Sequence, residues 1–212
     1  MIELTVFHWI VLLGFVICLI VCLYKTIKII NAGIPDDYAE ALGKPGPAIK
    51  YSLTTAMSPK KKETAYLHLP TYTAGILYHI GTFLGFTCLI LLFLNIELKN
   101  LMIYISSVII GISGICGFLI FLKRILSSKM RSLSNPDDYI SNILVTGFQL
   151  LIVLVLLTDG FYPVLFIFTT ILLLYIPVGK LRHFIYFFSS RVHLGVFFGR
   201  RGVWPVNKKK IL

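Results

Sequence analysis

The chain has 212 residues and a formal net charge of +11, with 57% hydrophobic and 14% charged residues. Soluble domains carry about 25% charged residues, so this composition excludes an ordinary soluble domain. Apolar runs of about 20 residues recur, which is the length that crosses the hydrocarbon core of a bilayer. We therefore expect an all-α integral membrane protein that forms a single membrane domain over residues 1–212.

Five membrane-spanning helices are predicted, at about residues 4–30, 71–94, 101–122, 137–157 and 162–190. The first run is long for a signal peptide and lacks a small-x-small cleavage site, so we expect it to be retained. The last helix has the option of continuing past the bilayer to about His193, and a basic cytoplasmic tail, 194–212, follows. A cytoplasmic loop, 31–67, joins the first two spans and is rich in proline and glycine, which predicts mostly irregular structure.

The tetrapeptide Pro-Asp-Asp-Tyr occurs twice, beginning at Pro35 and at Pro136. In the second copy Asn135 can cap a helix, Pro136 suits the first helical position, and the aspartates favour the positive end of the helix dipole. We interpret the copies as two similar helix starts, not as a duplicated domain. The first copy could start a short surface helix.

The basic residues predict the orientation in the membrane. They lie at the end of the first span and in loop 31–67, between the third and fourth spans, and near the C-terminus; Lys99 is the single exception. By the positive-inside rule the N-terminus is outside and the C-terminus cytoplasmic, in the inner (cytoplasmic) membrane. The charge is thus a topology signal and does not indicate nucleic-acid binding. A basic inner face can also receive an acidic soluble partner.

Four histidines in or beside two of the spans form the candidate site. Lipid offers an imidazole neither a partner nor water, so each histidine needs a reason to be there. His68 and His79 are 11 residues apart, and His183 and His193 are 10 apart, so each pair covers about 15–16 Å of helix. Antiparallel spans would place His79 level with His183 and His68 level with His193. The pattern predicts two haems, each held by two histidines between facing helices.

Residues beside these histidines are candidates for holding the haems. Gly75 and Gly179 each lie four residues before a histidine, where a missing side chain leaves room for a porphyrin. Close helix packing is the alternative role for both glycines. Three basic residues can pair with haem propionates or extend to lipid headgroups: Lys180, Arg182 and Arg191.

Other notable residues in the apolar runs have simpler interpretations. His8, next to Trp9, is expected to be an interfacial anchor at the outer end of the first span. The four cysteines form no CxxC pair, which indicates neither zinc nor an iron–sulfur cluster. We interpret them as small apolar residues.

Two segments resemble haem motifs of a known family. Tyr78-His79-Ile80-Gly81 resembles the helix 2 motif of the respiratory nitrate reductase gamma subunit, and residues 177–183, PVGKLRH, resemble its helix 5 motif. The start of the fourth span is similar to the wider family, which includes the membrane cytochromes of heterodisulfide reductase. The resemblance implies two b-type haems, exchange with menaquinone or another quinone, and iron–sulfur and catalytic subunits as partners.

One position departs from the nitrate reductase pattern, which has a second histidine where this chain has Leu89. His68 must then supply the fourth haem ligand, or the chain holds a single haem. The departure points away from a true nitrate reductase subunit and towards the heterodisulfide-reductase-like branch of the family.

The predicted function is that of a di-haem cytochrome b subunit in a respiratory redox complex. A haem with two histidine ligands has no open coordination site and carries electrons. The chain shows no catalytic triad, phosphate loop or cluster-binding cysteines, so its partners would share the redox chemistry of an oxidoreductase. Weak candidates for a quinone site are Tyr72, Tyr78 and Thr82, with helix packing as their alternative.

Two other functions remain open. The chain could be a mono-haem cytochrome b anchor of a dehydrogenase or hydrogenase. It could also be a haem-free membrane scaffold or transporter subunit. Transporters usually show midplane charges or broken helices in repeated halves, and neither is visible in the sequence.

Overall fold

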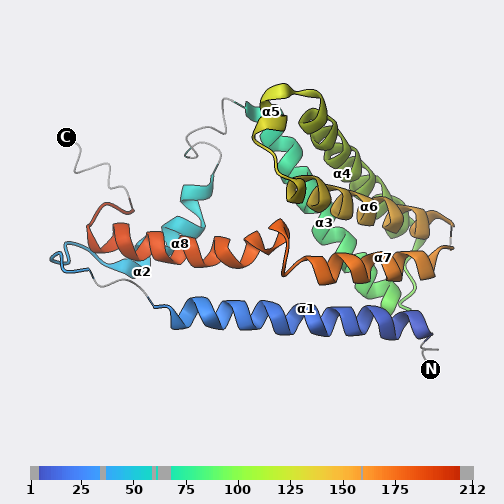
Figure 1. The fold of residues 1–212 in the computed structure, drawn as a ribbon, viewed down its shortest axis with the longest axis horizontal. Coiled ribbons are helices and arrows are strands. Elements are labelled where there is room, and N and C mark those ends of the chain that lie inside the picture. The colour runs from blue at the N-terminus through green and yellow to red at the C-terminus, as the bar shows by residue number, and fades with distance from the viewer. Residues whose placement is uncertain (1–4, 34–36, 59–60, 62–67, 159, 206–212) are drawn as a thin grey trace. The chain divides into compact units, whose positions relative to one another are not determined.

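The computed structural model describes residues 5–33, 37–58, 61, 68–158 and 160–205. Helices account for 81% of the structure, and none of the described residues lies in a strand, which confirms the all-α class. The helices are α1 (Val6–Asn31), α2 (Pro45–Leu53), α3 (Leu69–Phe93), α4 (Asn100–Leu126), α5 (Ser128–Ser132), α6 (Pro136–Thr158), α7 (Tyr162–Tyr175) and α8 (His183–Arg200) (Figure 1).

Several helices have the length and composition of membrane spans. Among the described residues, α1, α3, α4 and α6 are long and apolar enough to cross a membrane, and the broken pair of α7 and α8 makes a fifth if it counts as one span. The chain is thus a plausible multi-pass membrane protein with four or five spans.

The chain divides into two compact units, which are described separately. Unit 1 contains Met1–Ile20 and Pro70–Leu181, and unit 2 contains Val21–Leu69 and Arg182–Leu212. The single membrane domain over residues 1–212 stays a prediction.

Helix α6 forms the core of unit 1. Half of its apolar span is buried, against 22–28% of the spans in α1, α3 and α4. Phe148, Gln149, Ile152 and Val155 are fully buried, and the 3–4 residue spacing of this set places it along one side of the helix. The helix begins as expected, because Asn135 and Asp138 exchange hydrogen bonds between each side chain and the other's backbone N–H. This reciprocal cap satisfies two N–H groups at the start of α6.

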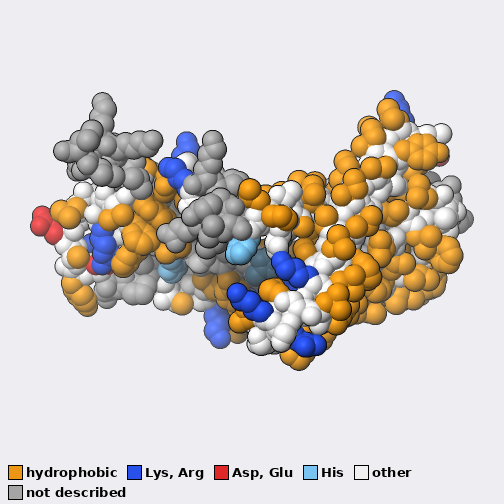
Figure 2. Space-filling view, turned by 90° about the horizontal axis from the view of Figure 1, so that it is seen from above, with side chains coloured by type: hydrophobic (Ala, Val, Ile, Leu, Met, Phe, Trp, Pro, Cys, Tyr) orange, Lys and Arg blue, Asp and Glu red, His pale blue; other side chains and the backbone are white. Residues whose placement is uncertain are grey.

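The outer surface of the helices is strongly apolar. Exposed large hydrophobic side chains follow α1 and α4 along their whole length, and hydrophobic atoms cover much of the visible surface in Figure 2. A monomer in water rarely exposes so much contiguous apolar area. Contact with lipid acyl chains explains this surface.

The fifth predicted span is not one continuous helix. α7 ends at Tyr175, a turn follows, and a 3₁₀ turn, η3 (Lys180–Arg182), leads into α8. Pro177 has no N–H to donate, which ends the helical ladder. The N–H groups of Val178 and Gly179 both bond to the carbonyl of Tyr175. The predicted tail is also partly helical, since α8 runs to Arg200, and residues 206–212 lie outside the described part.

The predicted irregular loop of unit 2 contains a helix. Residues 45–53 form α2, with Pro45 and Pro47 in its first turn, and η1 (Thr55–Met57) follows. Helix α2 packs on α8 through glycines: a Cβ on Gly195 would lie 2.5 Å from the Ile49 Cα, and one on Gly199 would lie 2.8 Å from the Ala48 Cβ. Ala48 and Ser52 are fully buried in this contact. The sequence favoured an irregular loop here because α2 is short and because α8, the helix on which it packs, is distant in the chain.

We expect Gly195→Ala to displace α2 from α8, because the new methyl group would overlap backbone atoms of Ile49. Overpacking of this kind costs about 1–3 kcal/mol. Limited proteolysis of the full chain in detergent should show faster cleavage within residues 45–53. Gly46→Ala is the matched control in α2 itself, since no atom lies within 4 Å of its added Cβ. Equal protection of the two variants would contradict the packing described.

Candidate functional site

His79 is presented on an open face of α3. Its side chain is exposed, and its Nδ1 lies 2.7 Å from the Gly75 carbonyl oxygen one turn earlier. If Nδ1–H donates to this carbonyl, the ring lone pair is at Nε2, which is the usual tautomer of a histidine that binds a metal. No heavy atom of the described residues lies within 4 Å of a Cβ built on Gly75. The face that carries Gly75 and His79 therefore has room for a flat ligand, and close packing does not explain this glycine.

The other small residues of α3 serve helix packing. A Cβ on Gly81 would overlap the side chain of Ser113 on α4, and one on Gly85 would lie 3.1 Å from the ring of Phe148 on α6. Both glycines are buried. Helix α3 thus has a packing face and an open face, and His79 is on the open one.

The other three histidines lie in unit 2. His68 directly precedes α3, which begins at Leu69 and runs through Pro70, two residues earlier than the span was expected to start. His183 is the first residue of α8 and is exposed, whereas His193, ten residues along the same helix, is half-buried. His79 belongs to unit 1, so its pairing with His183 stays a prediction, as does that of His68 with His193.

No group of three or more His, Cys, Asp or Glu side chains able to hold a metal ion occurs among the described residues. A haem needs only two axial histidines, so the finding does not bear on that prediction.

Gly179 has a different environment from Gly75. A Cβ on Gly179 would overlap the ring of Tyr175, whose hydroxyl lies 3.3 Å from the Ser141 hydroxyl and 3.4 Å from the carbonyl oxygen of Asp137. The missing side chain makes room for Tyr175 in the turn between α7 and η3. Close packing therefore accounts for Gly179 better than a porphyrin does.

Lys180 has a protein partner. Its Nζ lies 2.6 Å from Asp138 Oδ2, and Asp138 Oδ1 also pairs with Arg124 at 2.9 Å. Asp138 is only 9% exposed, whereas the side chains of Lys180 and Arg124 are 49% and 25% exposed. Arg182 is half-buried, and the Arg191 guanidinium lies 5.6 Å from the centre of the Phe187 ring. The ion pair with Asp138 holds Lys180 in the turn that follows α7. The pairing of Lys180 with a haem propionate stays a prediction.

Two of the three predicted quinone residues, Tyr78 and Thr82, belong to a polar network between α3 and α6. Tyr78 Oη donates to the Asn142 carbonyl at 3.2 Å and lies 2.9 Å from Thr146 Oγ1. Thr82 Oγ1 accepts from the Gln149 amide at 2.8 Å. Tyr72, the third candidate, is half-buried. For Tyr78 and Thr82 the contacts support the packing alternative, because they hold α3 to α6.

Asp37 is a site residue that the sequence did not single out. Its carboxylate receives hydrogen bonds from Arg201 Nη1 and Nη2 at 2.7 and 3.3 Å, and Arg200 Nη2 donates to its carbonyl at 3.2 Å. Pro35 and Asp36 lie outside the described residues, but Asp37 to Glu40 are not helical, so the short helix expected here is wrong for them. The recurrence of Pro-Asp-Asp-Tyr was the available signal.

Unit 2 also contains a hollow of about 1030 Å³ beside α8. Its lining includes His193, Arg200 and Arg201 together with aromatic side chains such as Tyr186 and Phe197. His193, a predicted haem ligand, therefore lines a hollow whose wall also holds Asp37, the ion-pair partner of both arginines.

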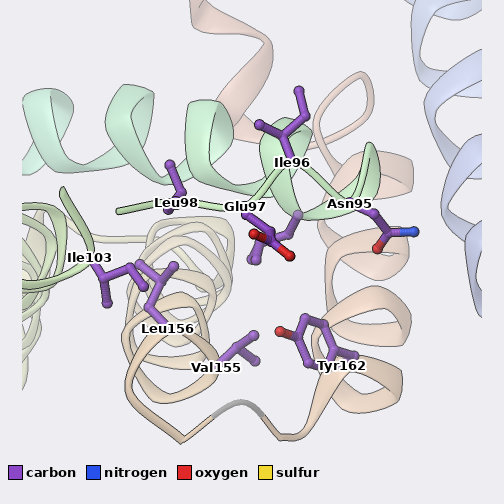
Figure 3. Close-up of a pocket in the computed structure, with 9 residues that line it drawn as sticks. Asn95, Ile96, Glu97, Leu98, Ile103, Val155, Leu156 and Tyr162 are labelled. Atoms are coloured by element: carbon purple, nitrogen blue, oxygen red, sulfur yellow. The ribbon is translucent and has the colours of Figure 1, made fainter. Parts of the chain in front are cut away.

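A second hollow lies at the far end of unit 1. This cavity of about 470 Å³ is lined by the turn after α3 and by α4, α6 and α7, and Figure 3 shows the Glu97 carboxylate and the Tyr162 hydroxyl turned into it. It lies beyond Phe93, about 21 Å along α3 from His79 at 1.5 Å per residue. The cavity is thus separate from the predicted haem region.

His8 is not the interfacial anchor expected from the sequence. Its ring is 7% exposed and packs against Phe93 and Phe166, with ring centres 5.3 and 4.8 Å away. Its Nδ1 lies 2.8 Å from Thr5 Oγ1, so His8 helps to close the start of α1. Trp9 is 57% exposed, so of the two residues only Trp9 is placed to act as the predicted interfacial anchor.

No protein-family model matches the chain, and no curated protein and no solved structure matches it either.

The ion pair of Asp37 predicts a pH dependence of unit 2. The hydrogen bond from the Ala39 N–H and the guanidinium groups of Arg201 and Arg200 lower the pKa of Asp37. A lowered pKa adds stability above the ordinary aspartate pKa of about 3.9, and this stability is lost as the pH falls through the lower folded value. Proteolytic protection of residues 37–43 should therefore decrease below about pH 4.

Asp37→Asn should remove the ion pair at every pH. Residues 37–43 should then be less protected at neutral pH, and their protection should decrease less on acidification than in the wild type. Glu40→Gln, a few residues along the same segment, is the matched control and should keep the wild-type profile. An unchanged profile in Asp37→Asn would show that the pair does not hold the segment.

Proposed function

We infer that the chain is a membrane cytochrome b subunit that transfers electrons between a quinone pool and an iron–sulfur partner on the cytoplasmic side. The observation that carries this proposal is the geometry of His79. An imidazole on an apolar helix is exposed, lies within hydrogen-bond distance of the Gly75 carbonyl, and has open space on the same face.

The predicted ligand and glycine residues differ in how well their surroundings would accommodate a haem. His79 and Gly75 offer a ligand and a clear face, and His193 offers a ligand beside a hollow lined with arginines. Gly179 does not provide the matching clear face, because Tyr175 occupies it. We propose His79 with His183 for one haem and His68 with His193 for a second. Bound haem would supply reversible one-electron transfer, and the chain would hold the iron between two neutral imidazoles.

The resemblance of residues 78–81 and 177–183 to haem motifs of the nitrate reductase gamma and heterodisulfide reductase families also supports the proposal. It is the basis for the quinone, for the iron–sulfur and catalytic partners, for the cytoplasmic membrane, and for an outside N-terminus. The basic residues that follow the first, third and fifth predicted spans fit a face that receives an acidic protein.

The test is haem content and spectrum of the purified full chain. We expect about two haems per chain, and one haem to be lost in both His79→Ala and His183→Ala. His68→Ala and His193→Ala should each remove the other haem. His8→Ala is the control, because His8 lies in a ring cluster with Phe93 and Phe166, and it should keep both haems. A wild-type chain without haem would reject the proposal, and one haem that survives His68→Ala would favour the mono-haem anchor.

The open face of α3 permits a sharper test. Gly75→Leu should exclude the haem bound by His79, because the new side chain fills the space that the ligand needs. Gly111→Leu on α4 is the matched control, since its Cβ also meets no atom within 4 Å. Both variants should fold, and only the first should lose an absorbance band. Equal haem content in the two would show that this face does not bind haem.

A further inference from the structure

The hollow of unit 2 follows one face of α8. Tyr186, His193 and Arg200 all line it, and each is seven residues from the next. Seven residues are close to two turns of an α-helix, so the three side chains leave the helix in nearly the same direction. Neighbours in this series are about 10.5 Å apart along the axis. The imidazole of His193 thus lies midway between a phenol and a guanidinium, and all three residues belong to unit 2.

The two arginines that line the hollow are not equivalent. Arg201 donates to the carboxylate of Asp37 through Nη1 and Nη2, at 2.7 and 3.3 Å. Arg200 reaches only backbone carbonyls through Nη2, that of Asp37 at 3.2 Å and that of Ala39 at 3.4 Å. The Nε of Arg200 is 3.8 Å from the Asp37 carboxylate and makes no hydrogen bond to a described residue. The single carboxylate therefore binds Arg201, and Arg200 retains a positive charge for a further anion.

The rest of the lining indicates what kind of anion fits. Most of it is apolar, with two hydroxyls: Ser189, Ser190, Leu194, Val196, Phe197 and Phe198. The volume of about 1030 Å³ is at the upper end of the range of cofactor pockets. A small inorganic anion would leave the apolar wall without a partner. A haem has an apolar macrocycle with carboxylates at one edge, and an imidazole at the middle of the hollow can ligate its iron.

Arg191, a predicted propionate partner on the same helix, is placed differently. It is two residues from His193, which turns it by about 200° around the helix. Its guanidinium lies 5.6 Å from the centre of the Phe187 ring, and it does not line the hollow. Arg200 is more distant from His193 in sequence but shares its face. For a haem bound by His193, the geometry therefore favours Arg200 over Arg191.

We propose that Arg200 binds a propionate carboxylate of the haem that His193 ligates. This inference rests on the proposed haem function. The side chain of Arg200 is 37% exposed, so it can bind a ligand without leaving the carbonyls that hold Nη2. The propionate edge of the haem lies towards the end of α8, and its apolar edge lies towards Tyr186. Asp37 contributes by occupying Arg201, so that one positive charge faces one carboxylate.

The test uses the full chain in detergent, loaded with haem or with haem dimethyl ester, whose carboxylates are neutral. The relevant haem is the one that His193→Ala removes. In the wild type an excess of a soluble haem-scavenging protein should extract haem about fivefold more slowly than the ester, the effect of a partly exposed charge pair. Arg200→Gln should remove this difference by speeding the loss of haem alone. Arg200→Lys should keep part of it, because the ammonium retains the charge.

The control is Arg191→Gln, which should keep the wild-type ratio of the two extraction rates. This ratio decides the matter, because a variant that only loosened α8 would release haem and ester faster alike. An unchanged ratio in Arg200→Gln, or a ratio lost in Arg191→Gln instead, would overturn the role of Arg200. A wild type that holds haem but releases haem and ester equally would overturn this inference alone. A wild type without haem would reject the proposed function and this inference with it.

Discussion

The structure of unit 1 depends on the inability of lipid to form hydrogen bonds. A polar group inside a membrane must find its partner on another helix or bear the cost of being unpaired. Asn142, Thr146 and Gln149 line one side of α6, and Tyr78 and Thr82 of α3 bond to this row. The central carbonyl of this network is that of Tyr78, which receives Gln149, Thr82 and Ser113. These bonds fix the rotation of α3 about its axis.

That rotation explains why a histidine can be available on an apolar helix. Once Tyr78, Gly81 and Gly85 face α4 and α6, the following position, His79, must point elsewhere, because successive helical residues are turned by about 100°. Gly75 shares its direction, being one turn earlier. The open face of α3 is thus a consequence of its packing face. Two adjacent residues thus differ in their surroundings, because Tyr78 bonds to α6 and His79 lies on the exposed side of α3.

Much of the fold follows from composition, and much of the site does not. Long apolar runs predicted α1, α3, α4 and α6. The cap at the start of α6 could be predicted because Asn135, Pro136 and the two aspartates are adjacent in the sequence. The α2–α8 contact could not be predicted, since it depends on Gly195 and Gly199 meeting a short segment about 150 residues earlier. The break after Tyr175 had its signals in Pro177 and Gly179, but membrane helices often tolerate proline.

The candidate site shows the same division. The spacing of four histidines was visible in the sequence, but the contrast between Gly75 and Gly179 depends on which side chain fills the space beside each. Tyr175 fills one, and nothing within the described residues fills the other. Likewise, sequence could identify Lys180 as a cation but not choose its partner, because Asp138 reaches it only after α6 and α7 have packed.

The contact between α2 and α8 has a consequence for the order of synthesis. A helix of nine residues, such as Pro45–Leu53, is too short to persist by itself in water, and its partner is made only after α3, α4, α6 and α7. During translation the segment 45–53 therefore has no packing partner until α8 has been made. Unit 2 is completed last, although its residues 21–69 are made before residues 70–181 of unit 1. Quality control of a truncated chain could then recognise an exposed, unfolded α2 segment.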